Sequence, residues 1–144
     1  MTIHLVKLCV GADSVDDLRS WVKRRTAANA AAGRGKVHDH VTRMSPRRRD
    51  ELLDGGSIYW VIKGIILVRQ EILDLETVTG ADGIDRCAIL IKPKLYETEA
   101  FPRKAFQGWR YLKPENAPAD LRHDRAGRAP PAALRAELAA LGLL

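Results

Sequence analysis

The chain has 144 residues, of which 46% are hydrophobic and 29% are charged. This size and balance are those of one ordinary folded domain, so we expect a single α+β domain over residues 1–144 rather than a disordered chain. Lys7 interrupts the first apolar stretch and no apolar run could cross a bilayer, which argues against a leader, a transit peptide and a membrane span. Cys9 and Cys87 lie in apolar runs, where buried, reduced thiols of a cytoplasmic protein are expected.

The formal net charge is +6, and it is unevenly distributed. Residues 1–49 hold 11 Lys or Arg against 4 Asp or Glu, residues 50–101 hold 5 against 10, and residues 102–144 hold 8 against 4. Two basic thirds that meet in space would form a positive face for a polyanion. Solvated charges without a partner are the alternative.

Four elements are expected before residue 57. Ser14 and the two aspartates after it have the form of a helix cap with an acidic first turn, and apolar residues then recur every three or four positions. Pro46 follows a capping serine, and Gly55-Gly56 would end a second helix. The expected elements are a strand over residues 3–10, a helix from Ser14 to Arg25, a short polar strand or an extended loop over residues 37–43, and a helix from Pro46 to Asp54.

The centre of the chain is dense in β-branched and aromatic residues. A tight turn at Lys63-Gly64 predicts a hairpin of residues 58–62 with residues 66–72. Further strands are expected over residues 86–91 and 106–112, and an alanine-rich helix over residues 132–141 would dock through Leu134, Leu138 and Leu141. The predicted fold is therefore α+β: a curved mixed or antiparallel sheet of about five strands, partly closed, with two N-terminal helices and a C-terminal helix.

The segment from Phe101 to Lys113 interleaves aromatic rings with cations. Bases stack on exposed rings and cations neutralise phosphates, so this pattern suits single-stranded nucleic acid. In a strand, Trp109 and Tyr111 would project from one face and Arg110 from the other. Rings buried in the core beside solvated cations are the alternative. The candidate contacts in this segment are Arg103, Lys104, Trp109, Arg110 and Tyr111.

Three adjacent arginines, Arg47, Arg48 and Arg49, stand at the expected start of the second helix. The helix dipole disfavours positive charge there, so a run kept at that place is a candidate phosphate contact. A solvated surface cluster is the alternative.

His38 and His40 are two residues apart, which would place both imidazoles on one side of a strand. Two ligands do not make a metal site, and a third would have to come from a distant residue such as His4 or His123. A catalytic acid or base role for His40 is an equally open alternative. The chain contains no nucleophile elbow, phosphate loop, dinucleotide fingerprint or C-x-x-C pair. No catalytic residue, metal or cofactor is therefore predicted.

Four stretches carry a resemblance to a known family: Gly55 to Gly64 (GGSIYWVIKG), Arg69-Gln70, Ala105 to Leu112 (AFQGWRYL) and Ala117 to Leu121 (APADL). They are similar to a short alphaproteobacterial family of proteins of unknown function, DUF1489. The resemblance covers nearly the whole chain and implies a bacterial, cytoplasmic setting but no activity. A weaker, architectural similarity to PUA-like domains, including ASCH domains, implies a small β pseudo-barrel of a kind that often meets RNA or modified bases.

These observations predict a non-catalytic nucleic-acid-binding protein whose partner is RNA. Two alternatives stay open. One is a small enzyme acting on a nucleotide or another anionic metabolite at a His38/His40 site, and the other is a protein-interaction subunit with exposed aromatic residues. A deep pocket beside His40 would favour the enzyme, and a flat basic face would favour RNA. No membrane partner is expected, and the sequence leaves the oligomeric state open.

Overall fold

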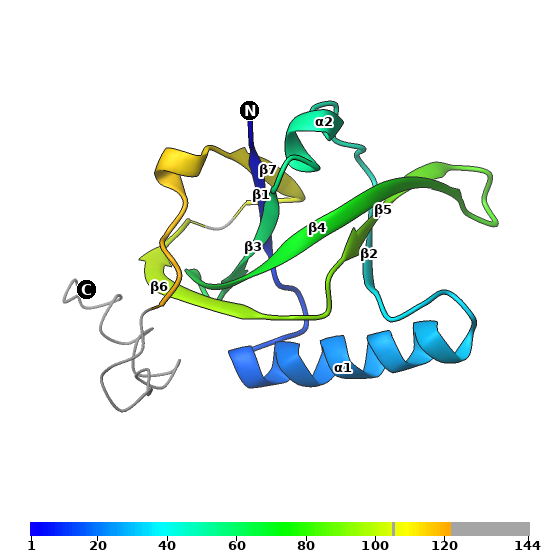
Figure 1. Ribbon diagram of the computed structural model, residues 1–144, viewed down its shortest axis with the longest axis horizontal. Helices are drawn as coiled ribbons and strands as arrows, with labels where there is room; N and C mark the ends of the chain where they lie inside the picture. Colours follow the sequence, from blue (N-terminus) through cyan, green and yellow to red (C-terminus); the bar gives the residue numbers. More distant parts are fainter. Residues whose placement is uncertain (105, 122–144) are drawn as a thin grey trace.

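The computed structural model describes residues 1–104 and 106–121, so the helix expected over residues 132–141 lies outside the described residues. The described chain is dominated by a seven-stranded mixed sheet with one long helix against it (Figure 1). No helix in this part of the chain is long and apolar enough to span a membrane. The elements are β1 (His4–Leu8), α1 (Val15–Ala31), β2 (His38–Thr42), α2 (Arg49–Leu52), β3 (Ser57–Ile62), β4 (Ile65–Thr79), β5 (Asp85–Ile91), β6 (Tyr96–Pro102), β7 (Trp109–Leu112) and the 3-10 turn η1 (Pro114–Asn116).

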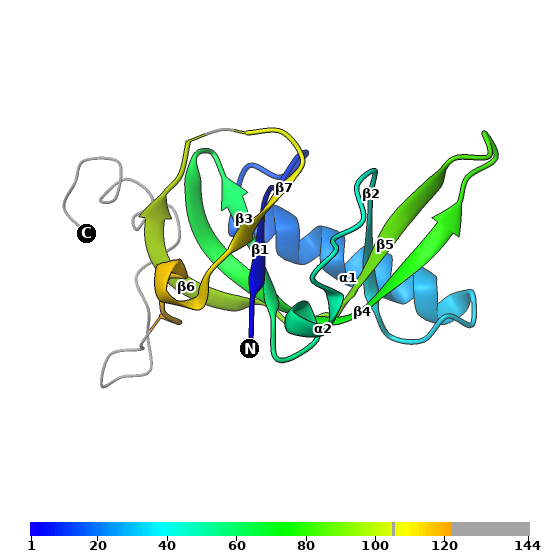
Figure 2. The same ribbon diagram turned by 90° about the horizontal axis from the view of Figure 1, so that it is seen from above.

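Strand β4 organises the sheet because it pairs with three others. Its first half pairs with β3 and with β6, and its second half pairs with β5, all antiparallel. Strands β1 and β3 are parallel, and β7 lies antiparallel on the outer side of β1. The order is β2-β5-β4-β3-β1-β7, with β6 attached to β4. The sheet curves strongly, and the ends of β4 and β5 project beyond it (Figure 2).

The hairpin of β3 and β4 confirms the turn expected at Lys63-Gly64. Lys63 has φ 50° and Gly64 has φ 81°, the pair of positive values that a type I′ turn needs. Ile62 and Ile65 pair directly across this turn. Since all six residues of β3 are buried, the strand shows no alternation of apolar and polar residues.

Two apolar clusters pack on the two faces of the sheet. Helix α1 contributes Val15, Leu18 and Val22 to the larger cluster, which it forms with β1, β3, β4 and β5. The helix lies across one face of the sheet in Figure 1. The smaller cluster is inside the curl formed by β1, β3, β4 and β7, and its members are Val6, Tyr59, Val61, Ile66 and Leu112.

The expectation of two N-terminal helices and about five strands is wrong in part. Helix α1 forms as expected, with the Ser14 side chain capping the backbone N–H of Asp17 at 3.1 Å. The second helix, α2, is one turn of four residues, because the preceding residues are held by tertiary contacts described below. Strand β6 has no clear signal in the sequence, since Tyr96–Pro102 mixes glutamates with apolar residues and ends in proline. The sheet is not closed, and the PUA-like similarity stays a prediction.

Gly56 lies where α2, β1 and β3 approach one another most closely. A Cβ atom on Gly56 would lie 2.3 Å from the Leu52 carbonyl oxygen and 2.4 Å from that of Ile3. Both are backbone atoms of packed segments, so neither can move away without disturbing the packing around it. Glycine is therefore required at this position by space rather than by its own dihedral angles.

We expect Gly56→Ala to lower the free energy of unfolding by about 3 kcal/mol, because overpacking here must move backbone. Gly80→Ala is the matched control: its Cβ would meet the flexible ends of the Arg86 and Asp82 side chains, and we expect a loss of only about 0.5 kcal/mol. Urea unfolding of both variants, followed by circular dichroism, measures the difference. Equal losses would contradict this account.

Candidate nucleic-acid interface

A cluster of cations forms where the end of β6, the β3–β4 turn and the start of β7 meet. The backbone N–H of Arg103 donates to the Gly64 carbonyl at 2.7 Å, which places Lys63 beside the Arg103-Lys104 pair. The chain then crosses to β7 over this end of the curl (Figure 2). We call this the cationic end surface, and its members are Lys63, Phe101, Arg103, Lys104, Phe106 and Arg110.

Phe106 holds two of these cations in place. The guanidinium groups of Arg103 and Arg110 each lie 5.4 Å from the centre of its ring, within the range of cation–π attraction. The ring also packs against the smaller apolar cluster. Arg110 further donates to the carbonyls of Gln107, at 2.9 Å, and Trp109, at 3.0 Å. These contacts restrain the guanidinium groups without neutralising them.

The four cations of this surface make no ion pair with any residue that the structure describes. The stretch from Phe101 to Lys113 contains no Asp or Glu. Phe101 keeps 46% of its surface exposed, which is unusual for a large ring. Exposed positive charge therefore lies beside an exposed aromatic ring. Sequence reasoning missed Lys63, because only the hairpin brings it next to a segment 40 residues further along.

Trp109 and Tyr111 have a different position from the one predicted for stacking. They lie on the face opposite Arg110, half-buried, with their rings 4.9 Å apart in an edge-to-face contact. Trp109 Nε1–H donates to the Met44 carbonyl at 2.9 Å. The Tyr111 hydroxyl accepts the backbone N–H groups of Arg47, at 2.9 Å, and of Arg48, at 3.1 Å. Both rings thus fix the segment before α2.

The arginine run is largely neutralised. Arg48 forms an ion pair with Glu51 and lies 5.4 Å over the Tyr111 ring, and Arg49 forms an ion pair with Asp74. Arg47 is exposed and makes no ion pair with a described residue. The predicted contacts are therefore divided: Arg103, Lys104 and Arg110 gather at the cationic end surface, while Arg47–Arg49 gather with Trp109 and Tyr111 on the other face.

His38 and His40 are packed among indole rings. His38 is fully buried, with its ring 5.2 Å from that of Trp21, and His40 lies 5.3 Å from the ring of Trp60. Gln70 lies beside His38, but its amide is engaged by Trp60 Nε1–H at 2.9 Å and by the Lys92 carbonyl at 3.1 Å. Neither His38 nitrogen has a hydrogen-bond partner among the described residues. In the described part of the chain, no three residues with metal-binding side chains come together.

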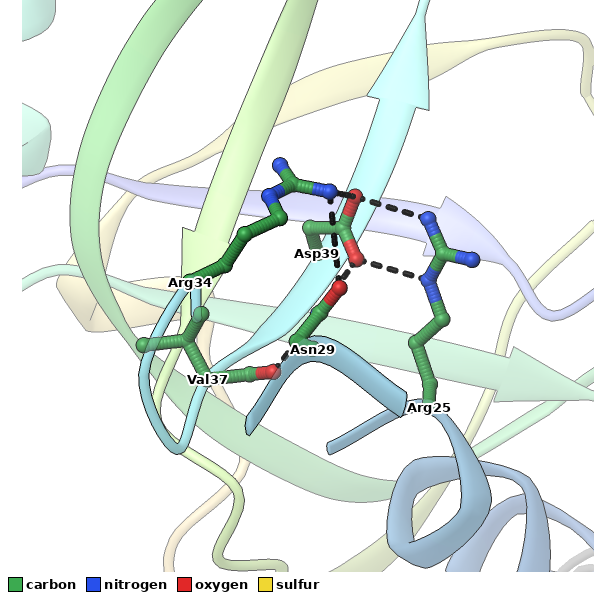
Figure 3. A network of polar contacts seen from close by, with 5 residues as sticks. All are labelled: Arg25, Asn29, Arg34, Val37 and Asp39. Carbon is green, nitrogen blue, oxygen red and sulfur yellow. Dashed lines mark hydrogen bonds and ion pairs between the residues drawn. The ribbon is translucent and has the colours of Figure 1, made fainter. Parts of the chain in front are cut away.

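Asp39, between these histidines, joins the end of α1 to β2 (Figure 3). Its carboxylate accepts Arg25 Nε–H at 2.7 Å and Nη2–H at 3.0 Å, and Asn29 Nδ2–H at 2.8 Å. Arg34 lies 3.7 Å away, and Asn29 also donates to the Val37 carbonyl at 2.8 Å. The bonds from Arg25 hold the pKa of Asp39 well below its usual range. The carboxylate serves as an anchor for α1.

Burial lowers the pKa of both histidines, and that of His40 to about 4, with the charge of Lys7 acting in the same direction. Both rings are therefore neutral in the folded protein at pH 7. An unfolded chain takes up protons at these residues near pH 6.5, whereas the folded protein does so only at lower pH. Their contribution to stability is thus present above pH 6.5 and is lost as the pH falls toward 4.

We expect the free energy of unfolding to fall by up to about 1.4 kcal/mol per pH unit through His40 between pH 6.5 and about 4, and His38 to steepen this fall below pH 6.5. His40→Phe should reduce the dependence of the unfolding free energy on pH by the contribution of one titrating group, because phenylalanine binds no proton. Val41→Phe, at an exposed neighbouring position, should keep the wild-type slope. Urea unfolding at several pH values measures both. An unchanged slope in His40→Phe would show that His40 is not held neutral by burial.

We compared the chain with family models, with curated proteins and with solved structures, and a family model matches it. Neither the curated proteins nor the solved structures include a match to this chain. The family model described as a protein of unknown function, DUF1489, matches residues 5–144. This match spans the sheet, α1 and both faces described above. The chain therefore belongs to the DUF1489 family.

Proposed function

We propose that this protein binds RNA, as a single strand, at the cationic end surface. The observation that carries the proposal is the set of four cations without acidic partners among the described residues, two of which lie over the Phe106 ring, together with the exposed Phe101 ring in the same segment. Phosphates are attracted by the cations, and a splayed base can stack on an exposed ring. The partner would have to be single-stranded at this surface, since bases in a duplex are already stacked.

The arrangement is suited to binding without catalysis. Restrained guanidinium groups lose little side-chain entropy when they meet a phosphate, and they keep a fixed spacing. No acidic group stands among them to act as a general base, since residues 101–113 contain none. The surface therefore offers charge and stacking, which do not depend strongly on base sequence.

The enzyme alternative has less support. A hollow of about 760 Å³ in the described residues lies between α1 and the β5–β6 connection. Its lining includes Arg19, Lys23, Lys36 and Lys94 over an apolar floor, but neither His38 nor His40. His38 is fully buried, and His40, which packs against Trp60, is only partly exposed. The cationic end surface, with its unpaired cations and exposed Phe101 ring, supports RNA binding better than the histidines support catalysis.

We expect Arg103→Ala combined with Lys104→Ala to weaken binding of a fluorescent single-stranded RNA about tenfold or more at low salt. The plot of log Kd against log salt concentration should become shallower by about 0.7 for each phosphate that the protein no longer neutralises. Fluorescence anisotropy across a salt series measures both quantities. Lys23→Ala with Arg24→Ala removes the same charge from exposed positions on α1 and is the control. Identical behaviour of the two double variants would refute the proposed surface.

We expect Phe101→Ala to weaken the same RNA about fivefold to a hundredfold, because base stacking on a ring contributes about 1–3 kcal/mol. The salt dependence should stay as in the wild-type protein, since no charge is removed. Leu73→Ala, at another exposed apolar position, is the control. Thermal unfolding checks that both variants remain folded. Unaltered affinity in Phe101→Ala would remove the stacking contact from the proposal.

A further inference from the structure

A polar hollow of about 300 Å³ lies at the other end of the curl from the cationic end surface. Its side-chain lining comes from four separate stretches: His4 on β1, Ser57 and Tyr59 on β3, Arg69 on β4, and Asp120 after η1. Strand β3 runs from Ser57, in the hollow, to Ile62, next to Lys63 of the cationic end surface, so the two sites are roughly 17 Å apart along the strand. The hollow is thus distinct from the surface proposed for RNA.

Arg69 is the fixed centre of this hollow. Its guanidinium forms a two-pronged ion pair with Asp120, Nε to Oδ1 and Nη2 to Oδ2 both at 2.7 Å, and donates from Nη1 to Ser57 Oγ at 2.9 Å. It also stacks 4.4 Å over the Tyr96 ring. The Arg69 side chain is only 18% exposed and stands on the strand that pairs with β3 and β6. Its fork is therefore held in one orientation.

His4 contributes a hydrogen-bond donor to the same space. Its Nδ1 accepts the backbone N–H of Ser57 at 2.9 Å. Burial, and then the charge of Arg69, lower the pKa of His4, so the ring is neutral at pH 7. A neutral imidazole that accepts at Nδ1 carries its proton on Nε2, which is then a donor. Within the described residues, that Nε2 has no hydrogen-bond partner.

Tyr59 adds a second free donor. Its ring lies 5.2 Å from that of His4 in an edge-to-face contact. Burial raises the pKa of its hydroxyl, which therefore stays protonated. The described residues provide no hydrogen-bond partner for this hydroxyl either. Donors from His4, Tyr59 and Arg69 thus line one small space, in which the single acceptor with a full charge is the Asp120 carboxylate.

The two members of the Arg69–Asp120 pair are held very differently. Arg69 is fixed in a central strand, as described above. Asp120 is 48% exposed at its side chain and follows η1, on a segment bonded to β6 by the Glu99 N–H to the Ala119 carbonyl and the Leu121 N–H to the Glu97 carbonyl, both at 2.8 Å. Of the two partners, the Asp120 side chain is the one that can rotate away while its backbone stays in place. Its carboxylate occupies the fork as a bound anion would.

We propose that this hollow binds the phosphate group of a small phosphorylated molecule, and that the phosphate replaces the Asp120 carboxylate on Arg69. A phosphoryl group offers three oxygens to the Arg69 fork, His4 Nε2–H and the Tyr59 hydroxyl, whereas a carboxylate offers two. The volume of about 300 Å³ is at the lower end of ligand pockets, which fits a small metabolite. The Asp120 side chain then rotates out of the guanidinium fork toward solvent when phosphate binds.

Calorimetric titration of the full chain with inorganic phosphate tests this inference. Asp120→Asn removes the competing carboxylate, so we expect the phosphate affinity to rise about tenfold or more. Asp74→Asn is the matched control, since it removes the carboxylate from another exposed Arg–Asp pair, that of Arg49. An affinity no higher in Asp120→Asn than in Asp74→Asn would overturn the proposal.

Tyr59→Phe in the Asp120→Asn background tests whether phosphate is bound by several donors of the hollow or is only attracted by the charge of Arg69. It removes one hydroxyl and keeps the ring, so we expect phosphate binding to weaken about fivefold or more. Equal affinity with and without the hydroxyl would mean that phosphate meets Arg69 alone, which contradicts the site. Acetate should bind more weakly than phosphate, and equal binding would overturn the assignment to phosphate. Arg103→Ala with Lys104→Ala should leave phosphate binding unchanged, so failure here is independent of the RNA proposal.

Discussion

The pairing of β3 with β4 holds the sheet together and separates its two apolar faces. Every residue of β3 is buried, and the strand lies between the parallel neighbour β1 and the antiparallel neighbour β4. One apolar cluster lies under α1 and the other inside the curl. Both faces of β3 are shielded from water, so a polar group on this strand needs a hydrogen-bond partner within the protein. The indole N–H of Trp60 is such a group. Gln70, on the facing strand, supplies its partner.

The same hairpin fixes both proposed binding sites, at its two ends. At the turn, Lys63 lies beside Arg103 because the Arg103 backbone bonds to Gly64. At the open end, Arg69 pairs with Tyr59 and reaches diagonally to the Ser57 hydroxyl, and all three line the polar hollow. The two sites differ in chemistry: one is an exposed group of unpaired cations, and the other is a concave set of donors around a paired arginine. We propose that both bind anionic groups, RNA at the first and a small phosphorylated molecule at the second.

Several charged residues that attract attention in the sequence serve the fold instead. Asp39 anchors the end of α1, and Arg48 and Arg49 are neutralised by nearby acids. His38 and His40 fill space between α1 and the sheet as neutral rings. A charge held in a bidentate pair contributes to local order and is less available to a partner than an unpaired one. The charges proposed to meet RNA are, by contrast, those without an acidic partner among the described residues.

Local signals in the chain were enough to predict the capped helix α1, the turn at Lys63-Gly64, the strand before Pro93 and the acid-free basic stretch after Phe101. These features depend on neighbours in the chain, whose contacts are fixed by spacing. Tertiary contacts alone turn Trp109 and Tyr111 toward the segment before α2, and they alone bring His4, Ser57, Arg69 and Asp120 to one hollow. Such groupings join residues more than 50 positions apart, and strand order, which sets them, leaves no mark in local sequence.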